Sequence, residues 1–243
     1  MIIFSHTNHY DGLSDDSAVR LVLSQTVEPQ KDGPIYRMFQ RLGLDFDLPK
    51  TLRMHPAFHY SLGTEEEFGR FPAMVLPYQD GRGAFLGLEL CFMSADGRFA
   101  PVVEPRMQYW LNEAGSGAFH AIDPPQGDYG VAVGYANALA AHHFTGVPMC
   151  AVSSASDLAA LDIPALVHTL TIFGDDTCTE ASRQLRTRCE SRGIRVQIVE
   201  PPTPHSTWLT EFTFRGAIPV DDVAADLSAK KTHNDSSDGG QHA

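Results

Sequence analysis

Short apolar runs alternate with segments of helical periodicity between residues 128 and 212. The apolar runs lie at residues 130–134, 147–152, 166–173 and 194–198. The run at 166–173 is almost continuously apolar, as expected of a central parallel strand that is covered on both faces. The run at 194–198 alternates cleanly between apolar and polar residues, which suits a strand nearer the edge. This alternation of strands and helices predicts a compact parallel α/β unit.

Three helices are expected between these strands. Residues 137–143 are rich in alanine, and Ser154 can cap a short helix that follows the second strand. Thr177 and Glu180 have the spacing of a capping box, so the longest helix is expected to begin there and to end at Gly193. Arginines mark the solvent face of this last helix: Arg183, Arg186, Arg188 and Arg192.

The first half of the chain predicts helices followed by a β-meander. Residues 15–23 suit a short helix, and residues 33–43 suit a second one that opens on Gly-Pro and closes on a glycine. Residues 51–56 read as a short extended segment because a proline disfavours helix at the residue before it. The meander is expected over residues 73–103, and residues 104–127 are loop-rich.

The prediction of a β-meander rests on two Asp-Gly pairs. The three strands are expected at residues 73–78, 84–93 and 98–103, and an Asp-Gly turn lies in each of the two connections. Asp-Gly between apolar runs is a strong short-range hairpin signal, because these residues tolerate the positive φ that tight turns need.

These patterns divide the chain into four parts. Residues 1–32 are an N-terminal segment, residues 33–127 hold the helix and the β-meander, and residues 128–212 form the parallel unit. Residues 213–243 begin with an amphipathic helix over 213–229 and end in a polar tail that is too poor in apolar residues to fold. The expected fold class is α/β, with a parallel-sheet domain preceded by a smaller domain of helix and β-meander.

The composition is that of a globular protein in a reducing compartment. Hydrophobic residues make up 43% of the chain and charged residues 20%, which is enough to bury an ordinary core. No apolar run approaches the roughly 20 residues that cross a bilayer, and the first residues lack the pattern of a signal peptide. The four cysteines are far apart without a C-x-x-C pair. A cytoplasmic protein without a membrane span, zinc ribbon or disulfide framework is therefore expected.

Two adjacent carboxylates, Asp175 and Asp176, follow the apolar run at 166–173. Ligands of open α/β sheets bind outside the carboxyl ends of the strands. Two aspartates at such a place could hold a hard divalent cation such as Mg²⁺, with Glu180 as a third carboxylate. The aspartates are also explained as turn and N-cap residues, and Glu180 is explained by the capping box. Both interpretations are open from the residues alone.

Three short motifs precede the parallel unit in a fixed order. They are YRMFQRLGL at residues 36–44, LRMHP at residues 52–56 and PAMV at residues 72–75. Together with the parallel unit at 128–212, this order resembles the primase-like Toprim proteins of plasmids and phages, over roughly residues 33–212. The resemblance implies a Toprim fold for the parallel unit. It also implies Mg²⁺-dependent phosphodiester chemistry, with a Glu after the first Toprim strand and an Asp-x-Asp pair after the third.

The positions that this resemblance assigns to catalysis hold other residues. The two acidic positions after the first strand fall on Val133 and Ala136, and the Asp-x-Asp pattern falls on residues 175–177 with the sequence DDT. Only Asp175 therefore matches an acidic position of the pair. The acidic loop of the family falls on residues 207–210, TWLT, which keep the Trp and no carboxylate. The resemblance thus implies a vestigial metal site and no cofactor, or Mg²⁺ if the protein is active.

The first hypothesis is a non-catalytic Toprim-fold accessory protein of a plasmid or other mobile element. It acts by binding a protein of the replication or DNA-transfer machinery, and inhibition of the fertility of a co-resident plasmid is one such role. The net charge of −12 suits a basic protein partner. The same charge disfavours broad nucleic-acid binding, because phosphate contacts by Lys and Arg supply most of that affinity.

The second hypothesis is an active Mg²⁺-dependent DNA primase or nucleotidyl transferase. Asp175, Asp176 and Glu180 then bind the metal, and Glu104 or His168 serves as the base. Such an enzyme positions the reacting groups and neutralises phosphate charge with its metal. A primer-synthesis assay separates this hypothesis from the first.

The third hypothesis is a nucleotide-binding α/β protein. Gly134 lies between the first apolar run and the Ala-rich helix, so a phosphate could bind at that helix start. The chain lacks the full G-x-G-x-x-G pattern and the Walker lysine, and a tight turn also explains Gly134. Arg183 and Arg186 are candidate docking or phosphate contacts, and a solvated helix face is the alternative.

Overall fold

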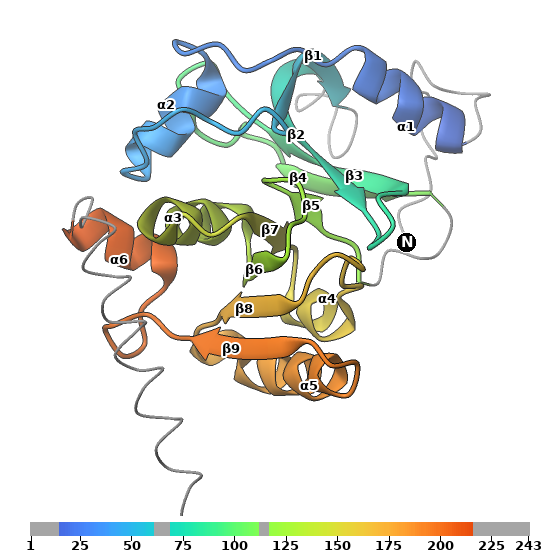
Figure 1. Cartoon of the computed structure of the whole chain (residues 1–243). Coiled ribbons are helices and arrows are strands. Elements are labelled where there is room, and N and C mark those ends of the chain that lie inside the picture. Colours follow the sequence, from blue (N-terminus) through green and yellow to red (C-terminus); the bar gives the residue numbers. More distant parts are fainter. Residues whose placement is uncertain (1–14, 61–68, 112–116, 216–243) are drawn as a thin grey trace, which may run out of the picture.

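The computed structural model describes residues 15–60, 69–111 and 117–215, which form two β-sheets and their helices. The expected amphipathic helix over 213–229 and the polar tail lie outside these residues from 216 onward. Figure 1 shows the first sheet above and the second sheet below, with one helix, α3, between them. The mixed α/β fold class that the sequence predicts is confirmed. None of the described helices is long and apolar enough to span a membrane.

The first sheet is antiparallel, with the strand order β1-β2-β3-β4. Two helices precede it, α1 (Asp15–Ser24) and α2 (Pro34–Arg41), close to the predicted ranges. The apolar face of α1 packs on one face of the sheet, and α2 belongs to the cluster on the other face. The strand bounds are β1 (Arg53–Tyr60), β2 (Gly69–Gln79), β3 (Phe85–Phe92) and β4 (Arg106–Trp110).

The third meander strand was predicted in the wrong place. Residues 98–103 make only an isolated bridge between Phe99 and Met93, and the strand that pairs with β3 is β4 at Arg106–Trp110. Pro101 explains the difference, because proline cannot donate a ladder hydrogen bond. The segment at 51–56 is also longer than expected. It continues as strand β1, which accommodates Pro56 at an irregularity between His55 and Phe58.

The second sheet has the order β5-β7-β6-β8-β9. The strands β6 (Asp128–Val133), β7 (Met149–Val152), β8 (Thr169–Phe173) and β9 (Arg195–Val199) are parallel. The short β5 (His120–Ala121) pairs antiparallel with β7, and no pattern in the sequence predicts it. The expected edge position of the strand near 194–198 is confirmed, because β9 ends the sheet.

The helices cover both faces of the second sheet. Apolar residues of α3 (Tyr135–Thr145) and α6 (Trp208–Arg215) belong to a cluster that also holds Ala132 of β6. Apolar residues of α4 (Ala155–Ala160) and α5 (Thr179–Glu190) belong to the cluster with Val131 on the opposite face. Ser154 caps α4, as predicted, by accepting a hydrogen bond from the backbone N–H of Asp157.

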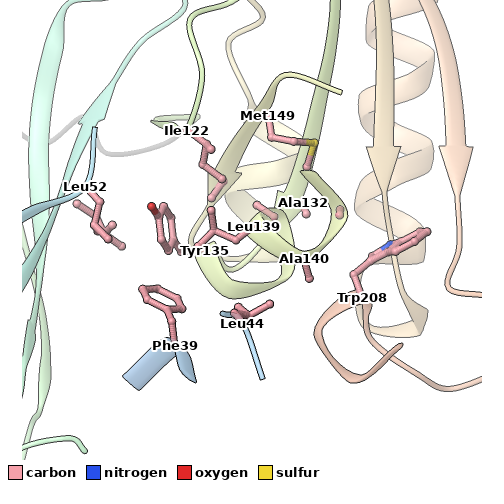
Figure 2. Close-up of a cluster of buried hydrophobic side chains, with 14 of the residues drawn as sticks. Phe39, Leu44, Leu52, Ile122, Ala132, Tyr135, Leu139, Ala140, Met149 and Trp208 are labelled. Atoms are coloured by element: carbon pink, nitrogen blue, oxygen red, sulfur yellow. The ribbon is translucent and has the colours of Figure 1, made fainter. Parts of the chain in front are cut away.

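Helix α3 joins the two sheets into one core. Figure 2 shows Tyr135 and Leu139 of α3 facing Leu52 and Phe39 of the first half, while Trp208 lies on the far side of the helix. Burying large apolar side chains is the dominant favourable term in folding, at about 25 cal/mol per Å². A backbone bridge between Gln79 and Phe119 ties the end of β2 to the segment that leads into β5. The two sheets therefore share a hydrophobic core.

Candidate functional site at the carboxyl edge of the parallel sheet

The parallel strands end at one edge, which we call the carboxyl edge. The last residues of these strands are Val133, Val152, Phe173 and Val199. Asp175 and Asp176 follow Phe173 after a single glycine, so they lie at the carboxyl edge as the sequence predicts. This is the region where open α/β sheets bind ligands.

The Asp175 carboxylate caps the turn that leads into α5. Its oxygen Oδ1 accepts hydrogen bonds from the backbone N–H of Thr177 at 2.9 Å and from the Thr177 hydroxyl at 2.5 Å. Residues Asp176–Cys178 form one 3-10 turn, and a capping box joins Asp175 and Cys178. Asp175 is held by these contacts in an extended backbone conformation immediately before the turn.

The predicted capping box of Thr177 and Glu180 is therefore wrong. Thr177 already lies in the 3-10 turn, so its hydroxyl bonds back to Asp175 and does not cap α5. The Glu180 side chain is exposed on α5, where it accepts a hydrogen bond from Gln184 at 3.1 Å and lies 3.6 Å from Arg183. The capping-box pattern predicted a cap at Thr177, two residues after the observed cap at Asp175, because it takes no account of the 3-10 turn before α5.

Asp176 points away from Asp175 into a contact with His205. The His205 ring nitrogen Nδ1 pairs with the Asp176 carboxylate, and both side chains are largely exposed. His205 has a φ of 60°, a left-handed conformation that is uncommon for residues other than glycine. The two adjacent aspartates therefore have separate partners, one within its own turn and one in the loop before α6.

Asn137 ties the carboxyl edge to α6. Its side-chain N–H donates to the backbone carbonyl of Val133 at 3.0 Å, and its side-chain oxygen accepts from the backbone N–H of Leu209 at 3.1 Å. Beside it, Trp208 is only 4% exposed and packs edge-on against Phe173, with ring centroids 5.2 Å apart. These contacts anchor α6 next to the end of β8.

Val133 and Ala136, which stand where the family resemblance expects acidic residues, are part of this packing. The Val133 side chain packs against the apolar cluster on the α4 and α5 face, and Ala136 packs against the cluster on the opposite face. Gly134 has a φ of 85° and donates its N–H to the carbonyl of Val152, so the tight turn needs a glycine. Among the described residues, no group of three or more His, Cys, Asp and Glu side chains is arranged to hold a metal ion. Asp175 and Asp176 are instead engaged by Thr177 and His205.

Arg183 and Arg186 lie on the outer side of α5. Arg183 is 3.6 Å from Glu180, and Arg186 is 4.0 Å from Glu190. Both arginines border a groove that α5 and β9 line, and Gly134 is not among its lining residues. The structure does not bring the two kinds of candidate phosphate contact together.

A second polar cluster, which the sequence analysis missed, lies where the first sheet meets the end of β7. We call it the joint network; it is centred on Glu89 of β3, which is 1% exposed. Its carboxylate accepts hydrogen bonds from Arg106 at 2.9 and 2.5 Å, from Tyr78 at 3.2 Å and from Gln108 at 3.1 Å. The Ser153 hydroxyl donates to Tyr78 at 2.7 Å and accepts from Gln108 at 2.9 Å. The network thus links both sheets.

The joint network lies in a strongly desolvated environment. Burial raises the pKa of the Tyr78 hydroxyl and of the nearby Cys91 thiol, and the charge of Glu89 adds to both effects. Both groups are therefore neutral at pH 7. The sequence signal for this cluster was a single acidic residue within the apolar run at 84–93. Buried carboxylates are rare unless they are paired, so an acidic residue in this run could have indicated that Glu89 has a partner, although not which one.

Replacing Asp175 by alanine tests the capping role. We expect Asp175→Ala to lower the free energy of unfolding by about 1 kcal/mol, because the N–H of Thr177 loses its acceptor. The matched control is Asp176→Ala, whose exposed side chain is expected to change stability by at most about 0.5 kcal/mol. Denaturant titration of both variants measures the difference. Equal effects would contradict the assignment of Asp175 as the cap.

Comparison with known proteins gives two family matches. Residues 128–211 match the Toprim domain, and residues 16–118 match a domain of unknown function (DUF7146). No curated protein matches the chain.

Solved primase structures are similar in fold. The zinc-binding and RNA polymerase domains of Aquifex aeolicus primase align with a TM-score of 0.52 and 14% identity, over 92% of this chain and 63% of that chain. A DnaG catalytic core aligns with a TM-score of 0.52 and 11% identity, over 88% and 78% of the two chains. The RNA polymerase domain of Mycobacterium tuberculosis primase DnaG, in complex with double-stranded DNA, gives 0.51 and 14%, over 87% and 78%. This chain thus spans less than two thirds of the Aquifex chain.

Proposed function

We propose that this chain, whose residues 128–211 match the Toprim domain, serves DNA replication or transfer by binding a protein partner without synthesising primers. The observation that carries this proposal is the use of the carboxyl edge for packing. Asn137 spans from Val133 to Leu209, and α6 is anchored there. The place where the family resemblance locates acidic chemistry is occupied by structural contacts.

The individual carboxylates support the same proposal. Asp175 is engaged by Thr177, the residue at the second Asp position of the family pattern. Asp176 pairs with His205, and Glu180 lies on the exposed side of α5. Loss of a catalytic acid or base typically costs a factor of about 10² to 10⁴ in rate, and loss of metal ligands adds to it. A site with these substitutions retains too little chemistry for useful primer synthesis.

The partner we propose is a protein of the replication or DNA-transfer machinery of a plasmid or other mobile element, such as a primase, a helicase or a transfer protein. The net charge of −12 favours a basic protein surface over direct binding to nucleic acid. A Toprim fold can retain a docking surface after it loses catalysis, because function resides in sites and not in the fold. Inhibition of the fertility of a co-resident plasmid is one role of this kind.

A primer-synthesis assay tests the non-catalytic part. We expect no template-dependent product with Mg²⁺ or Mn²⁺, and no difference between the wild-type chain and Asp175→Ala. Primer synthesis that Asp175→Ala abolishes, in a variant that remains folded by circular dichroism, would establish the alternative, an active Mg²⁺-dependent primase. Asp175→Asn is the matched control, because it keeps the side-chain oxygen that caps the turn.

A binding experiment tests the partner. The tagged chain is cross-linked and recovered from cells that carry a conjugative plasmid, and the bound proteins are identified by mass spectrometry. We expect enrichment of a replication or transfer protein, and the purified pair should associate in solution. Recovery of neither class, with the chain soluble and folded, would count decisively against the proposal.

A further inference from the structure

The outer edge of β9 has no strand partner among the described residues. β9 ends the second sheet, beyond β8. The backbone N–H of Arg195 donates to His168, and the carbonyl of Val199 accepts from Gly174, so these residues bond toward β8. Successive residues of a strand direct their backbone groups to opposite sides. The N–H and C=O groups of Val196 and Ile198 therefore point outward, away from β8.

A groove of about 1270 Å³ follows this edge. β9 lines it together with Arg183, Arg186 and Glu190 of α5, and the groove also extends over the neighbouring part of the sheet, to Asp128, Val147, Thr169 and Thr171. Figure 1 shows α5 running alongside β9 at the lower end of the molecule. The 12 residues of α5 span about 18 Å and the five residues of β9 about 16 Å. The groove thus accommodates one extended strand along the whole edge, with half-buried apolar side chains of Val196 and Ile198 beside it.

The charges of α5 that line the groove are ordered. Arg183 lies in the first half of the helix and Glu190 at its end. Arg183 faces Glu180 at 3.6 Å, with side chains 69% and 71% exposed, and Arg186 reaches Glu190 only at 4.0 Å. Exposed pairs of this kind contribute little to stability, so their members can exchange partners at little cost.

We propose that this edge pairs with the same edge of a second copy of the chain, antiparallel about a two-fold axis. With Gln197 opposite Gln197 of the second copy, Val196 faces Ile198 of the second copy in a hydrogen-bonded pair. This register uses the outward N–H and C=O groups of both residues. A two-fold axis makes the contact self-complementary, and it joins the two parallel sheets into one continuous sheet.

The order of charges is what favours a second copy as the occupant. When α5 is turned about the two-fold axis, Glu190 of one copy comes next to Arg183 of the other, and the reverse pair forms at the same time. Arg186, midway between them, comes opposite its own copy near the axis, and Glu190 at 4.0 Å on the same helix offsets part of that repulsion. A partner of uniform charge would meet an unfavourable residue at one end of the groove. Closing the edge also removes the aggregation risk of an unpaired strand.

Backbone pairing is tested first, on the full chain at about 0.15 M salt, which limits repulsion between the negatively charged copies. Light scattering of the wild type is expected to give twice the 26.6 kDa chain mass at high concentration. Val196→Pro removes an outward N–H that β8 does not use, so it should yield monomers. Val196→Thr keeps the N–H and should remain dimeric. A wild type that is monomeric at every concentration, or a Val196→Pro dimer, overturns the proposal.

A charge swap tests the register independently of folding. Arg183→Glu and Glu190→Arg should each weaken the dimer by about tenfold, because attraction becomes repulsion in both symmetric pairs. The double variant should recover wild-type affinity within about threefold. Each variant is checked by thermal unfolding, and the amides of Val196 and Ile198 should exchange more slowly as concentration rises. A double variant as weak as the single ones, or exchange independent of concentration, contradicts this interface.

Discussion

Arg106→Met is expected to lower the free energy of unfolding by about 3 kcal/mol. The replacement keeps most of the volume of the side chain and removes the positive charge that faces Glu89. The Glu89 side chain is only 1% exposed, and Arg106 donates to it at 2.9 and 2.5 Å. The Arg106 side chain is 56% exposed, but its removal leaves an uncompensated charge on the buried Glu89 carboxylate, in a medium of low dielectric constant, which is strongly destabilising.

The remaining donors do not replace the arginine. Tyr78, Gln108 and the Cys91 thiol still donate to the carboxylate, but all three are neutral and the thiol is a weak donor, so they recover only part of the lost energy. Denaturant titrations of the wild type and of Arg106→Met at pH 7 measure the loss.

Two variants control this prediction. Arg98→Met removes an exposed ion pair with Asp96 at 3.3 Å and should cost less than about 1 kcal/mol. Adding Glu89→Gln to Arg106→Met removes the buried charge while keeping an oxygen for Tyr78, so the double variant should regain most of the lost stability. If Arg106→Met behaves like Arg98→Met, the joint network does not hold the sheets together in the way its geometry indicates.

Local patterns predicted most of the Toprim domain. The strands β6, β7, β8 and β9 were expected from short apolar runs, and α4 from its serine cap, because buried parallel strands leave a strong signal in one stretch of sequence. The order of the strands along the sheet was not readable in the same way. Only the alternating pattern of 194–198 pointed to the edge.

Pairing between distant residues explains what the sequence did not predict. β4 lies in the segment 104–127, which the glycines and prolines mark as loop-rich, although Arg106, Met107, Gln108 and Tyr109 alternate between polar and apolar residues as in a strand. The polar side chains Arg106 and Gln108 serve Glu89 on the neighbouring strand. β5 has only two residues and exists through its pairing with β7, which lies far along the chain, so propensity and periodicity carry no information about it.

The candidate site was predictable in position but not in detail. The rule that places ligand sites at the carboxyl ends of strands located Asp175 and Asp176. The structure adds that their side chains turn to Thr177 and His205, respectively. The Asp176 carboxylate turns to a loop 29 residues away, which no local pattern indicates. The 3-10 turn that orients Asp175 is local, but its three residues are too few to leave a periodic signal.

His120 is expected to give folding a steep pH dependence on the acid side of neutrality. Its Nδ1 lies 2.8 Å from the carbonyl of Pro77, which only accepts, so Nδ1 carries the proton and Nε2 is bare. Within the described part of the chain, Nε2 is buried without a hydrogen-bond partner. Burial lowers the pKa of His120 from 6.5 to about 4, against smaller opposing effects of Pro77 and Glu89.

The sign of the effect follows from proton binding. The unfolded chain takes up a proton at this histidine below pH 6.5, whereas the folded chain stays neutral until about pH 4. The unfolded state therefore binds more protons in this window, and stability is complete above pH 6.5 and falls as the pH is lowered to about 4. The shift corresponds to a loss of about 3 kcal/mol. Burial also lowers the pKa of His55 and His143, which adds in the same direction.

His120→Gln isolates this contribution. The glutamine amide can donate to Pro77 but does not titrate, so the variant should lose about 3 kcal/mol less than the wild type between pH 7 and pH 4. His168→Gln replaces an exposed imidazole and should retain the wild-type pH profile. Urea titrations at half-unit pH steps compare the three chains. If the wild-type and His120→Gln profiles are parallel, His120 takes up its proton at the same pH in the folded and the unfolded chain. In that case water or a rearranged neighbour must accept a hydrogen bond from Nε2 in the folded protein.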